Sequence, residues 1–459
     1  MCGVTGVYAP GRDAARLAFF ALYALQHRGQ ESAGIAAADA TTLRWHKAMG
    51  LLGAIFDEEI LSGLSGHIAV GHTRYSTSGS SIVVNAQPLL ERSDLGDFAF
   101  AHNGNLTNTE EMRAALSPTV TLDAESDSEV LAKLLVEDQG PLIERIRRLL
   151  VRARGAYSVV LCTQDELYAF RDPWGVRPLG LGAFDDGGWI VASESCALGT
   201  VGARFVREIE PGEIVRIGAD GIESDRAVVE EKRPALCMFE YIYFARPDSE
   251  LNGRAIYMAR YAMGEALARE HPVEADVVIA VPDSAVPAGI GFSAEAGLPY
   301  IEGLIKNRYI GRTFISPDQQ MRSRGVQLKF NPLIENLRGR RVVVVDDSIV
   351  RGTTTPRIVS LLREAGAKEV HLRISSPPIL HPCYLGVDMA TYDELIAANL
   401  TIEEIRKHTG ADSLGYLSLD ALIAATGRRR DEMCLGCLTG SYPSVPAGHR
   451  PRKTAVSTS

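Results

Sequence analysis

The sequence lacks the features of a membrane-spanning, secreted or nucleic-acid-binding protein. No uninterrupted apolar run approaches the roughly 20 residues that a membrane-spanning helix needs. The net charge of −9 gives no overall electrostatic attraction to nucleic acids or anionic membranes. The first apolar stretch, LAFFALYAL, follows charged residues and has no cleavage-type end, so it predicts an amphipathic helix and not a signal peptide. We therefore expect a cytoplasmic protein with no nucleic acid and no membrane as partner.

Cysteines are few, and no internal repeat is visible. The chain has seven cysteines in 459 residues. A disulfide framework is not expected in the cytosol, so a subset of these cysteines favours a catalytic or metal-binding interpretation. Cys162 and Cys196 lie in no motif, and we interpret them as buried, inert thiols. The chain length exceeds what one hydrophobic core usually serves and predicts two or three domains.

The pattern of the chain changes near residue 232. Before it, short strand-like runs such as HIAVGHTRYST and GAYSVVLCT stop at turn residues, which predicts antiparallel sheets with packed helices. After it, β-branched runs enter polar, glycine-containing loops that lead into helices, which predicts an α/β domain with a parallel sheet. We place domains at 2–232 and 233–400, C-terminal helices with a cysteine-containing segment at 401–443, and a disordered tail at 444–459.

A cysteine stands at position 2, directly behind Met1. If Met1 is removed, which is itself an inference, the thiol and a free α-amine share one Cα. An α-amine has a pKa of about 7.7–8.0, so it can take the thiol proton and later return it. The alternative interpretation is that Cys2 only begins a buried strand as a small hydrophobic residue.

Four other residues supply what acyl transfer to Cys2 would need. Asn103 and Gly104 stand at the end of an expected strand and can donate hydrogen bonds to a developing oxyanion. Arg74 can bind a carboxylate and Asp127 an ammonium group, so together they would hold both ends of a free α-amino acid. Taken singly, Asn-Gly is commonly a turn, and a lone Arg or Asp is commonly a surface charge.

The segments that carry these residues resemble a known family. CGVTGVY, LQHRGQESAGIA, GHTRYSTSG, AHNGNLTN and SDSEV are similar, in order, to the N-terminal-nucleophile glutaminase domain of class II amidotransferases. The resemblance implies an α+β fold of αββα type, in which Cys2 attacks the side-chain amide of glutamine and releases ammonia. It further implies that Asn103 and Gly104 form an oxyanion hole. It also implies that Arg74 and Asp127 bind the glutamine.

The stretch VVVVDDSIVRGTTT, residues 342–355, is the informative part of the second half. Four valines predict a buried parallel strand that ends in Asp346 and Asp347, at the sheet edge where open α/β sheets bind ligands. Adjacent carboxylates can accept from ribose hydroxyls or bind a divalent cation. The loop that follows precedes a helix near Pro356 and can cradle an anion. A capped turn with two solvated acids is the alternative for the acid pair alone, but not for the whole segment.

This stretch resembles the phosphoribosyl diphosphate motif of type I phosphoribosyltransferases. The resemblance implies one Mg²⁺ per subunit at the acid pair, with Ser284 of the VPDSAVPAG loop as a further contact. It implies that phosphoribosyl diphosphate is bound by Asp346, Asp347, Ser348, Arg351, Gly352, Thr353, Thr354, Lys306 and Lys329. The two lysines belong to the basic segment 306–333, which resembles the lid of that family. A basic surface loop is the alternative for its individual charges.

A glutaminase followed by this transferase is similar to one family, the glutamine phosphoribosyl diphosphate amidotransferases, over about residues 2–440. The resemblance implies transfer of the glutamine amide nitrogen to C1 of 5-phosphoribosyl 1-diphosphate, the committed step of purine synthesis, with internal passage of ammonia. It also implies a homotetramer inhibited by purine nucleotides. Two alternatives are weaker. An amidotransferase that makes glucosamine phosphate or asparagine would need a different second domain, and a regulator that only senses the ligand would not need Cys2.

Four more cysteines form a candidate metal site. Cys434 and Cys437 are a Cys-x-x-Cys pair, the spacing that lets two thiolates bind one metal centre. Cys237 and Cys383 could complete a set of four, and their flanking segments resemble the branch of the family that holds one [4Fe–4S] cluster per subunit. Zinc stays the rival interpretation, and a redox dithiol is a further one for the pair alone.

Overall fold

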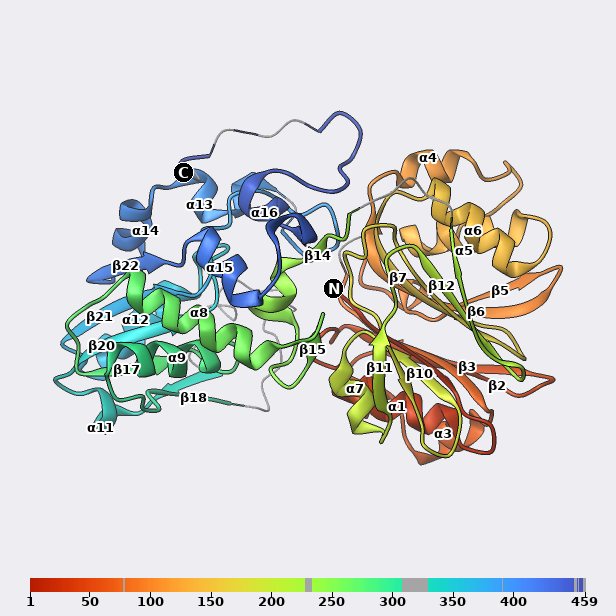
Figure 1. Cartoon of the computed structure of the whole chain (residues 1–459), viewed down its shortest axis with the longest axis horizontal. Coiled ribbons are helices and arrows are strands. Elements are labelled where there is room, and N and C mark those ends of the chain that lie inside the picture. The colour runs from red at the N-terminus through yellow and green to blue at the C-terminus, as the bar shows by residue number, and fades with distance from the viewer. Residues whose placement is uncertain are drawn as a thin grey trace.

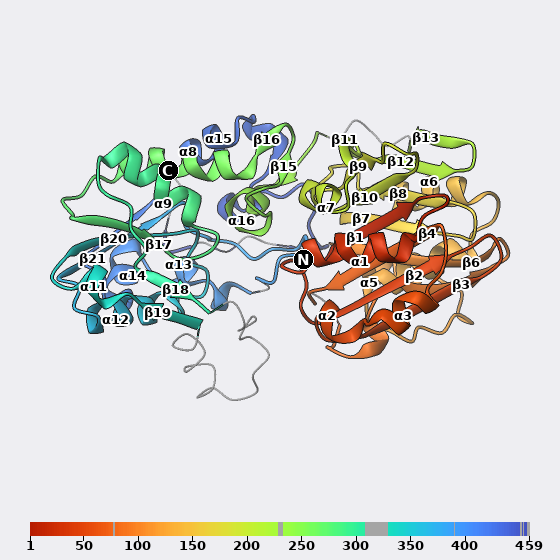
Figure 2. The ribbon, with the colours of Figure 1, turned by 90° about the horizontal axis from the view of Figure 1, so that it is seen from below.

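The computed structural model of the chain describes residues 1–76, 79–227, 233–307, 329–389, 391–449, 452 and 454–456. These residues form two lobes, and the N-terminus lies between them in both views (Figures 1 and 2). The first lobe is built from the chain up to residue 226, and the second from the chain beyond residue 236. None of the helices in these ranges is long and apolar enough to cross a membrane.

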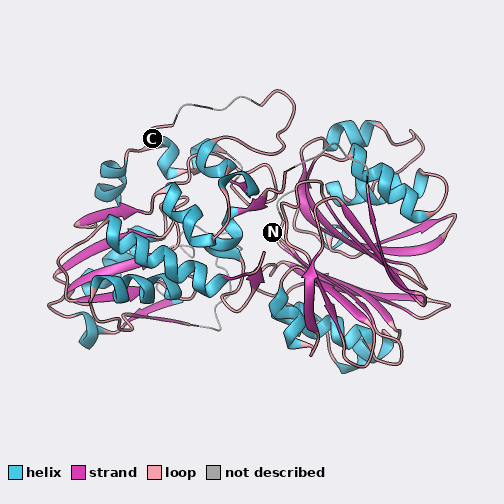
Figure 3. Cartoon of the chain, viewed as in Figure 1, coloured by secondary structure: helices cyan, strands magenta, loops and turns pink. Residues whose placement is uncertain are grey.

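The first lobe holds two antiparallel sheets, packed face to face (Figure 3). One sheet has its described strands in the order β11 (Arg204–Glu208), β9 (Gly180–Ala183), β10 (Trp189–Ala192), β1 (Gly3–Tyr8), β4 (Ile68–Arg74), β2 (Ser32–Ala38) and β3 (Leu43–Met49). The other runs β13 (Gly221–Arg226), β12 (Glu213–Gly218), β8 (Leu167–Arg171), β7 (Gly155–Cys162), β6 (Gly96–Leu106) and β5 (Leu89–Ser93). Apolar side chains of both inner faces, among them Val4, Val70 and Val160, form the core between them.

Helices cover the outer face of each sheet (Figure 1). The first sheet carries α1 (Ala14–Ala24), α2 (Leu52–Ile55), α3 (Glu58–Gly63) and α7 (Ser195–Thr200). The second carries α4 (Thr109–Ala114), α5 (Asp127–Glu137) and α6 (Leu142–Arg152). The Asp13 carboxylate caps α1 by accepting a hydrogen bond from the Arg16 N–H at 3.1 Å. The arrangement confirms the expected αββα fold.

The second lobe is built on a parallel sheet of four described strands, β17 (Val277–Ala280), β20 (Arg341–Asp346), β21 (Glu369–Ile374) and β22 (Ser413–Tyr416). The four valines of β20 are fully buried, as expected for a central parallel strand. The larger helices around the sheet are α8 (Ile256–Glu270), α9 (Val286–Ala296), α12 (Thr355–Glu364), α14 (Ile402–Thr409) and α15 (Leu419–Thr426). This confirms the expected α/β fold, and β22 shows that the sheet extends beyond residue 400.

Shorter elements complete the second lobe. Its short helices are α11 (Ile334–Leu337), α13 (Ile396–Asn399) and α16 (Gly436–Thr439). Its two-stranded pairs are β14 (Leu236–Cys237) with β23 (Met433–Cys434), β15 (Glu250–Leu251) with β16 (Arg254–Ala255), and β18 (Leu304–Lys306) with β19 (Phe330–Pro332).

Part of the segment expected as a tail makes defined contacts. The Ser444 hydroxyl lies 2.6 Å from the Thr107 hydroxyl of the first lobe. Further along, the backbone N–H of Arg452 donates to the Tyr392 hydroxyl of the second lobe at 3.2 Å. Residues 450, 451, 453 and 457–459 lie outside the described chain, and for them the disordered tail stays a prediction.

Helices α8 and α9 approach each other through glycines. A Cβ on Gly264 of α8 would lie 1.9 Å from the Ala288 carbonyl oxygen of α9. A Cβ on Gly291 of α9 would lie 2.0 Å from the Tyr261 carbonyl oxygen of α8. Because neither position has room for a methyl group, the two backbones can pack this closely only with glycine.

We expect Gly264→Ala to push α8 away from α9 and to lower the free energy of unfolding of the second lobe by about 1–3 kcal/mol. Urea unfolding followed by circular dichroism measures the change. Gly199→Ala is the matched control, because that helical glycine of α7 has no atom within 4 Å of an added Cβ. Equal effects of the two substitutions would contradict the close packing of the helices.

Candidate active sites

Cys2, which directly precedes strand β1, makes a hydrogen bond through its backbone N–H and another through its carbonyl. Cys2 N–H donates to the Asn103 Oδ1 at 3.0 Å, and the Cys2 carbonyl accepts from Arg28 Nε at 3.1 Å. The Cys2 thiol sulfur lies 3.4 Å from the backbone nitrogen of Tyr75. Met1 is only 2% exposed. A chain terminus usually frays, and here it is fixed at the junction of the two lobes.

Asn103 and Gly104, both predicted from the sequence, lie side by side in β6 next to this cysteine. Because Asn103 Oδ1 binds Cys2 N–H, its Nδ2 is left as a donor, and this buried atom has no partner among the described residues. Buried donors are rarely left unpaired, so the amide is available to an acceptor that arrives with a substrate. At Gly104 a Cβ would lie 1.9 Å from the Ala156 carbonyl oxygen, so the strand has room only for glycine.

Arg74, the predicted carboxylate-binding residue, ends β4 directly before Tyr75. Its guanidinium pairs with Glu31 and donates to the Ser80 carbonyl at 3.2 Å. Glu31 also accepts from the Ser76 N–H at 3.1 Å, so it fixes both Arg74 and the loop that follows. Sequence reasoning missed Glu31. Its partner Arg74 lies 43 positions away, and no local pattern connects them.

Asp127, the predicted ammonium-binding residue, begins α5 and is hydrogen-bonded to β6. Its Oδ2 accepts from the Leu106 N–H of β6 at 2.8 Å. The structure therefore brings Cys2, Asn103 and Asp127 to one end of the first lobe, with β6 as the element that connects them.

A buried histidine lies on β4, two residues before Arg74. His72 Nε2 is 3.1 Å from the His102 carbonyl oxygen, so Nε2 carries the proton of the neutral ring. His72 Nδ1 has no partner among the described residues. Burial lowers the pKa of His72 to about 3, because the charged ring would lose its hydration. The ring is therefore neutral near pH 7.

The predicted acid pair stands at the carboxyl end of β20. Asp346 ends the strand, and both Asp346 and Asp347 are buried. Asp347 accepts hydrogen bonds from the Ser284 hydroxyl and, at 2.6 Å, from the Ser348 hydroxyl. Burial raises the pKa of Asp346, and the charge of Asp347 raises it further. Burial also raises the pKa of Asp347. Two buried acids with a neighbouring hydroxyl form a set that a divalent cation would neutralise.

The loop from Ser348 to Thr354 leads from β20 into α12, as the motif predicts. Arg351 lies 3.5 Å from carboxylate oxygens of both Asp388 and Glu394. Thr353 and Thr354 are exposed directly before the N-terminus of α12. Gly352 is buried between them and Arg351, and its carbonyl is 3.1 Å from His408 Nε2. Backbone N–H groups and hydroxyls at a helix N-terminus are suited to a phosphate.

The two predicted lysines flank the acid pair. Lys306 pairs with Asp283, the residue before Ser284. The charge of Lys329 acts on both Asp346 and Asp347 and opposes the rise of their pKa values. Residues 308–328, which make up most of the predicted lid, lie outside the described chain.

The four predicted cluster cysteines come together at the junction of the lobes. Cys237 of β14 stands opposite Cys434 of β23 in the parallel pair. Burial raises the pKa of Cys437, and the neighbouring charges of Cys237, Cys383 and Cys434 raise it further. All four side chains are free thiols. Within the described ranges, no group of three His, Cys, Asp or Glu side chains is arranged to hold a single metal ion.

A loop that begins at Cys383 connects both sites. Its Tyr384 carbonyl accepts a hydrogen bond from the side-chain amide of Asn105, in β6, at 2.9 Å. Its Asp388 carboxylate accepts from the Tyr75 hydroxyl at 3.1 Å, and the same oxygen faces Arg351. Sequence reasoning did not identify Asp388, because its partners lie in two other segments of the chain.

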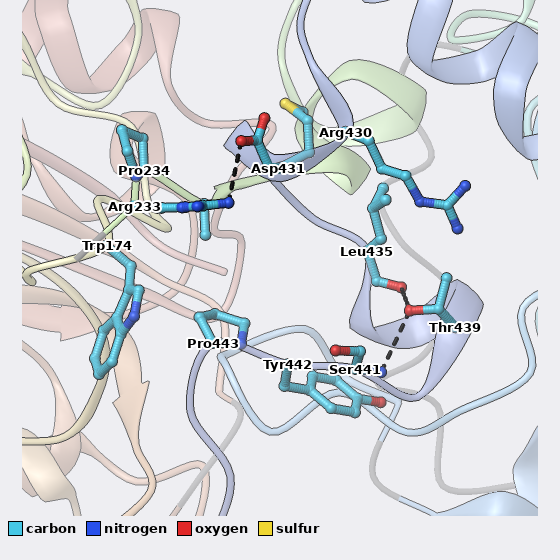
Figure 4. Close-up of a pocket in the computed structure, with 12 residues that line it drawn as sticks. Trp174, Arg233, Pro234, Arg430, Asp431, Leu435, Thr439, Ser441, Tyr442 and Pro443 are labelled. Atoms are coloured by element: carbon cyan, nitrogen blue, oxygen red, sulfur yellow. Dashed lines mark hydrogen bonds and ion pairs between the residues drawn. The ribbon is translucent and has the colours of Figure 1, made fainter.

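A pocket of about 410 Å³ lies beside the cysteine cluster (Figure 4). Trp174 and Tyr442 contribute aromatic walls, and Arg233 reaches across to pair with Asp431 at 3.3 Å. The segment that carries Cys434 forms another part of the lining. None of the residues predicted to bind glutamine or phosphoribosyl diphosphate lines this pocket.

Fold and sites together define a glutamine amidotransferase joined to a phosphoribosyl transferase. The model of the "Glutamine amidotransferase domain" family matches residues 72–200, and that of the "Phosphoribosyl transferase domain" family matches residues 254–382. The chain belongs to the amidophosphoribosyltransferase family. It is 50% identical over 452 residues to the amidophosphoribosyltransferase of Synechococcus elongatus, covering 96% of this chain and 91% of that one. It is also 50% identical to that of Methanocaldococcus jannaschii, covering 97% and 98%.

Solved structures agree with this assignment. The glutamine phosphoribosylpyrophosphate amidotransferase of B. subtilis, complexed with ADP and GMP, matches with a TM-score of 0.90 at 46% identity, covering 96% of this chain and 97% of that one. A structure described as the allosteric regulatory enzyme of purine biosynthesis matches with a TM-score of 0.92 at 45% identity over 100% of both chains.

We expect His72→Gln to make the protein more resistant to acid. The wild-type ring is neutral when folded, with a pKa of about 3, and takes up a proton near pH 6.5 when unfolded. Its contribution to stability is therefore complete above pH 6.5 and is lost as the pH falls toward 3. At pH 5 this loss amounts to about 2 kcal/mol. Glutamine can keep the donor to the His102 carbonyl and does not titrate.

The measurement is urea unfolding of both proteins at pH 7.5 and pH 5. The expected result is that the wild type loses about 2 kcal/mol more than the variant on acidification. Parallel losses in both proteins would show that His72 is not buried in its neutral form.

Proposed function

We propose that the protein is an amidophosphoribosyltransferase. It transfers the amide nitrogen of glutamine to C1 of 5-phosphoribosyl 1-diphosphate, giving 5-phosphoribosylamine, glutamate and pyrophosphate, the first committed step of purine synthesis. Similarity to the family over nearly the whole chain supports this function. The observation that carries it is the Asn103 amide, whose oxygen holds Cys2 while its buried NH₂ group has no partner among the described residues.

The first half-reaction takes place at Cys2. Its proton passes to the α-amine that removal of Met1 exposes, and the sulfur attacks the side-chain carbonyl carbon of glutamine. Asn103 Nδ2 and the Gly104 N–H donate hydrogen bonds to the oxygen on which negative charge develops. The amine returns the proton to the departing ammonia, and water then hydrolyses the thioester to glutamate. Because Met1 is buried, we infer that it is removed before the two lobes pack.

Glutamine is held at both ends of its backbone in this proposal. Arg74 binds the α-carboxylate, and Asp127 binds the α-ammonium group. Glu31 pairs with the Arg74 guanidinium and accepts a hydrogen bond from the Ser76 N–H. These are the donors that a substrate carboxylate would use, so Glu31 keeps them oriented.

The second half-reaction takes place at the end of β20. Ammonia forms a bond to C1 of the sugar while the bond from C1 to the pyrophosphate oxygen breaks, and its electron pair leaves with pyrophosphate. Asp346 and Asp347 bind the ribose, and the loop from Ser348 to Thr354 binds its 5′-phosphate. Lys306 and Lys329 are placed to contact the diphosphate. The ammonia passes internally from Cys2, which the contacts of the Cys383 loop with both sites support.

One Mg²⁺ per subunit fits the acid pair. Two buried carboxylates with raised pKa values and the Ser284 hydroxyl offer the oxygen ligands that this ion prefers. When bound, magnesium would neutralise negative charge on the diphosphate.

One [4Fe–4S] cluster per subunit, with a structural role, fits the four cysteines. Zinc, which binds four sulfurs at about 2.3 Å around a single ion, is the rival occupant of this set. In a cluster each thiolate binds a different iron, so the sulfurs stand farther apart. The ligands would be Cys237, Cys383, Cys434 and Cys437.

Regulation and assembly follow the family in this proposal. The enzyme is inhibited by purine nucleotides, in line with the relative that was solved with ADP and GMP. It assembles as a homotetramer. We place it in the cytosol, where its free thiols stay reduced.

The proposed function is tested by assaying phosphoribosylamine formation with either glutamine or ammonium as nitrogen source, together with glutamate release. Cys2→Ala is expected to abolish the glutamine-dependent reaction and to keep the ammonium-dependent one. Asn103→Ala is expected to lower kcat with glutamine by about 10²–10³. Asp347→Asn is expected to abolish phosphoribosylamine formation from glutamine and from ammonium. Cys162→Ala, which changes a buried thiol of the first lobe outside both sites, serves as the control.

Two outcomes would contradict the proposal. An equal loss of glutamine-dependent and ammonium-dependent activity in Cys2→Ala would contradict the separate action of the two sites. Retention of Met1, read by intact mass in an active enzyme, would remove the α-amine from the mechanism.

The cluster is tested by measuring iron, acid-labile sulfide and zinc on protein purified without oxygen. About four irons and four sulfides per chain are expected in the wild type. Cys437→Ser is expected to lose them, whereas Cys162→Ala keeps them, because Cys162 is buried in the first lobe away from this set. About one zinc per chain and no iron would overturn the cluster and leave the catalytic proposal intact.

A further inference from the structure

A single buried arginine connects the nucleophile to the second lobe. Arg28 Nε donates to the Cys2 carbonyl at 3.1 Å. Its terminal nitrogens donate to both carboxylate oxygens of Glu240, at 3.0 and 2.7 Å, and also to Glu194. The side chains of Arg28, Glu194 and Glu240 are all 0% exposed. This guanidinium is therefore completely enclosed, and its partners fix its plane.

The two acids differ in where they come from. Glu194 belongs to the first lobe, directly before α7. Glu240 lies 212 residues after Arg28 and begins a π-helical turn, Glu240–Phe244, that follows β14. A bidentate carboxylate determines the orientation of a planar guanidinium, so Glu240 sets the direction in which Arg28 Nε points.

The π-helical turn is held in place by another buried arginine. Arg260 of α8 donates to the Tyr241 carbonyl and to the Ala245 carbonyl, both at 2.8 Å. Burial lowers the pKa of Arg260 to about 10, and the charge of Asp347 acts against this decrease. Arg260 therefore lies within electrostatic reach of the acid pair at the phosphoribosyl site. Turns of this type are frequent at functional sites.

We propose that Glu240 is a positioning residue for the nucleophile. Through Arg28 it holds the backbone of Cys2, so that the second lobe sets the geometry in which the thiol attacks glutamine. The inference rests on the proposed function. Glu240 touches neither the substrate nor the reacting atoms in this account, and glutamine binding depends on Arg74 and Asp127.

The test is Glu240→Gln in the full-length enzyme. Its amide places an NH₂ group against the guanidinium, which breaks the bidentate contact. A displacement of the reacting atoms of the order of 1 Å costs about 10²-fold in rate. We therefore expect kcat of the glutamine-dependent reaction to fall by about 10- to 100-fold, with KM for glutamine changed less than threefold. The ammonium-dependent rate is expected to stay within twofold of the wild type.

Tyr241→Phe is the matched control. It removes a buried hydrogen bond, from the Tyr241 hydroxyl to the Leu251 carbonyl at 2.9 Å, one residue away in the same turn. It leaves the contact with Arg28 intact. The ratio of glutamine-dependent to ammonium-dependent rates is expected to equal that of the wild type, which separates positioning from a general loss of stability.

Two further results decide the inference. An unchanged ratio in Glu240→Gln would overturn it, and so would an equal fall in Tyr241→Phe. If Glu240→Gln does not fold because Arg28 loses one of its two countercharges, Glu240→Asp decides. That variant keeps the charge but shortens the side chain, so the ratio of glutamine-dependent to ammonium-dependent rates is expected to fall. An unchanged ratio would overturn the inference. A wild type inactive with both nitrogen sources would instead refute the proposed function.

Discussion

The proposed nucleophile stands directly behind Met1 and works only if this segment does not move, and this constraint governs the first lobe. Strand β1 lies between β4 and β10, and it pairs with β4 from Gly3 onward and with β10 from Thr5 onward. The hydrogen bond from Cys2 N–H to Asn103 crosses from one sheet to the other, because Asn103 lies in β6. The two sheets of the αββα sandwich thus each position one residue of the candidate site, Cys2 in front of β1 and Asn103 in β6.

The second lobe meets a different constraint, which is electrostatic. Asp346 and Asp347 lie side by side in a buried position, where their ionised forms repel each other and lose hydration. A parallel sheet makes such a site accessible, because loops from the ends of different strands converge at its carboxyl edge. Ser284 follows β17 and the acid pair follows β20, and the two strands are hydrogen-bonded neighbours. The charges of Lys329 and Arg260 oppose the rise in the pKa of Asp347, and burial outweighs them.

The sequence predicts both folds and most residues of the two candidate sites, because these residues lie in short segments with a local pattern. Four valines before an acid pair indicate a strand end without any knowledge of its partners. Glu31, Glu240 and Asp388 have no such pattern. Their roles arise from contacts with residues 43, 212 and 313 positions away, which only the folded chain brings together. The strand β22 escaped prediction for a related reason. A four-residue strand is too short to reveal its period, and the sequence around it predicts only helices.

The loop that begins at Cys383 contacts residues of both candidate sites. Its first residue belongs to the cysteine cluster, and its Gly386 lies so close to Gly104 that an added Cβ would be 3.1 Å from the Gly104 carbonyl carbon. Its Asp388 faces Tyr75 and Arg351, one from each site. Packed interiors do not deform continuously, so a shift at one end of this loop must be accommodated at the other. The segment that begins at Cys383 contacts β6 through Tyr384 and the loop after β20 through Asp388, so a displacement of Cys383 would shift both contacts.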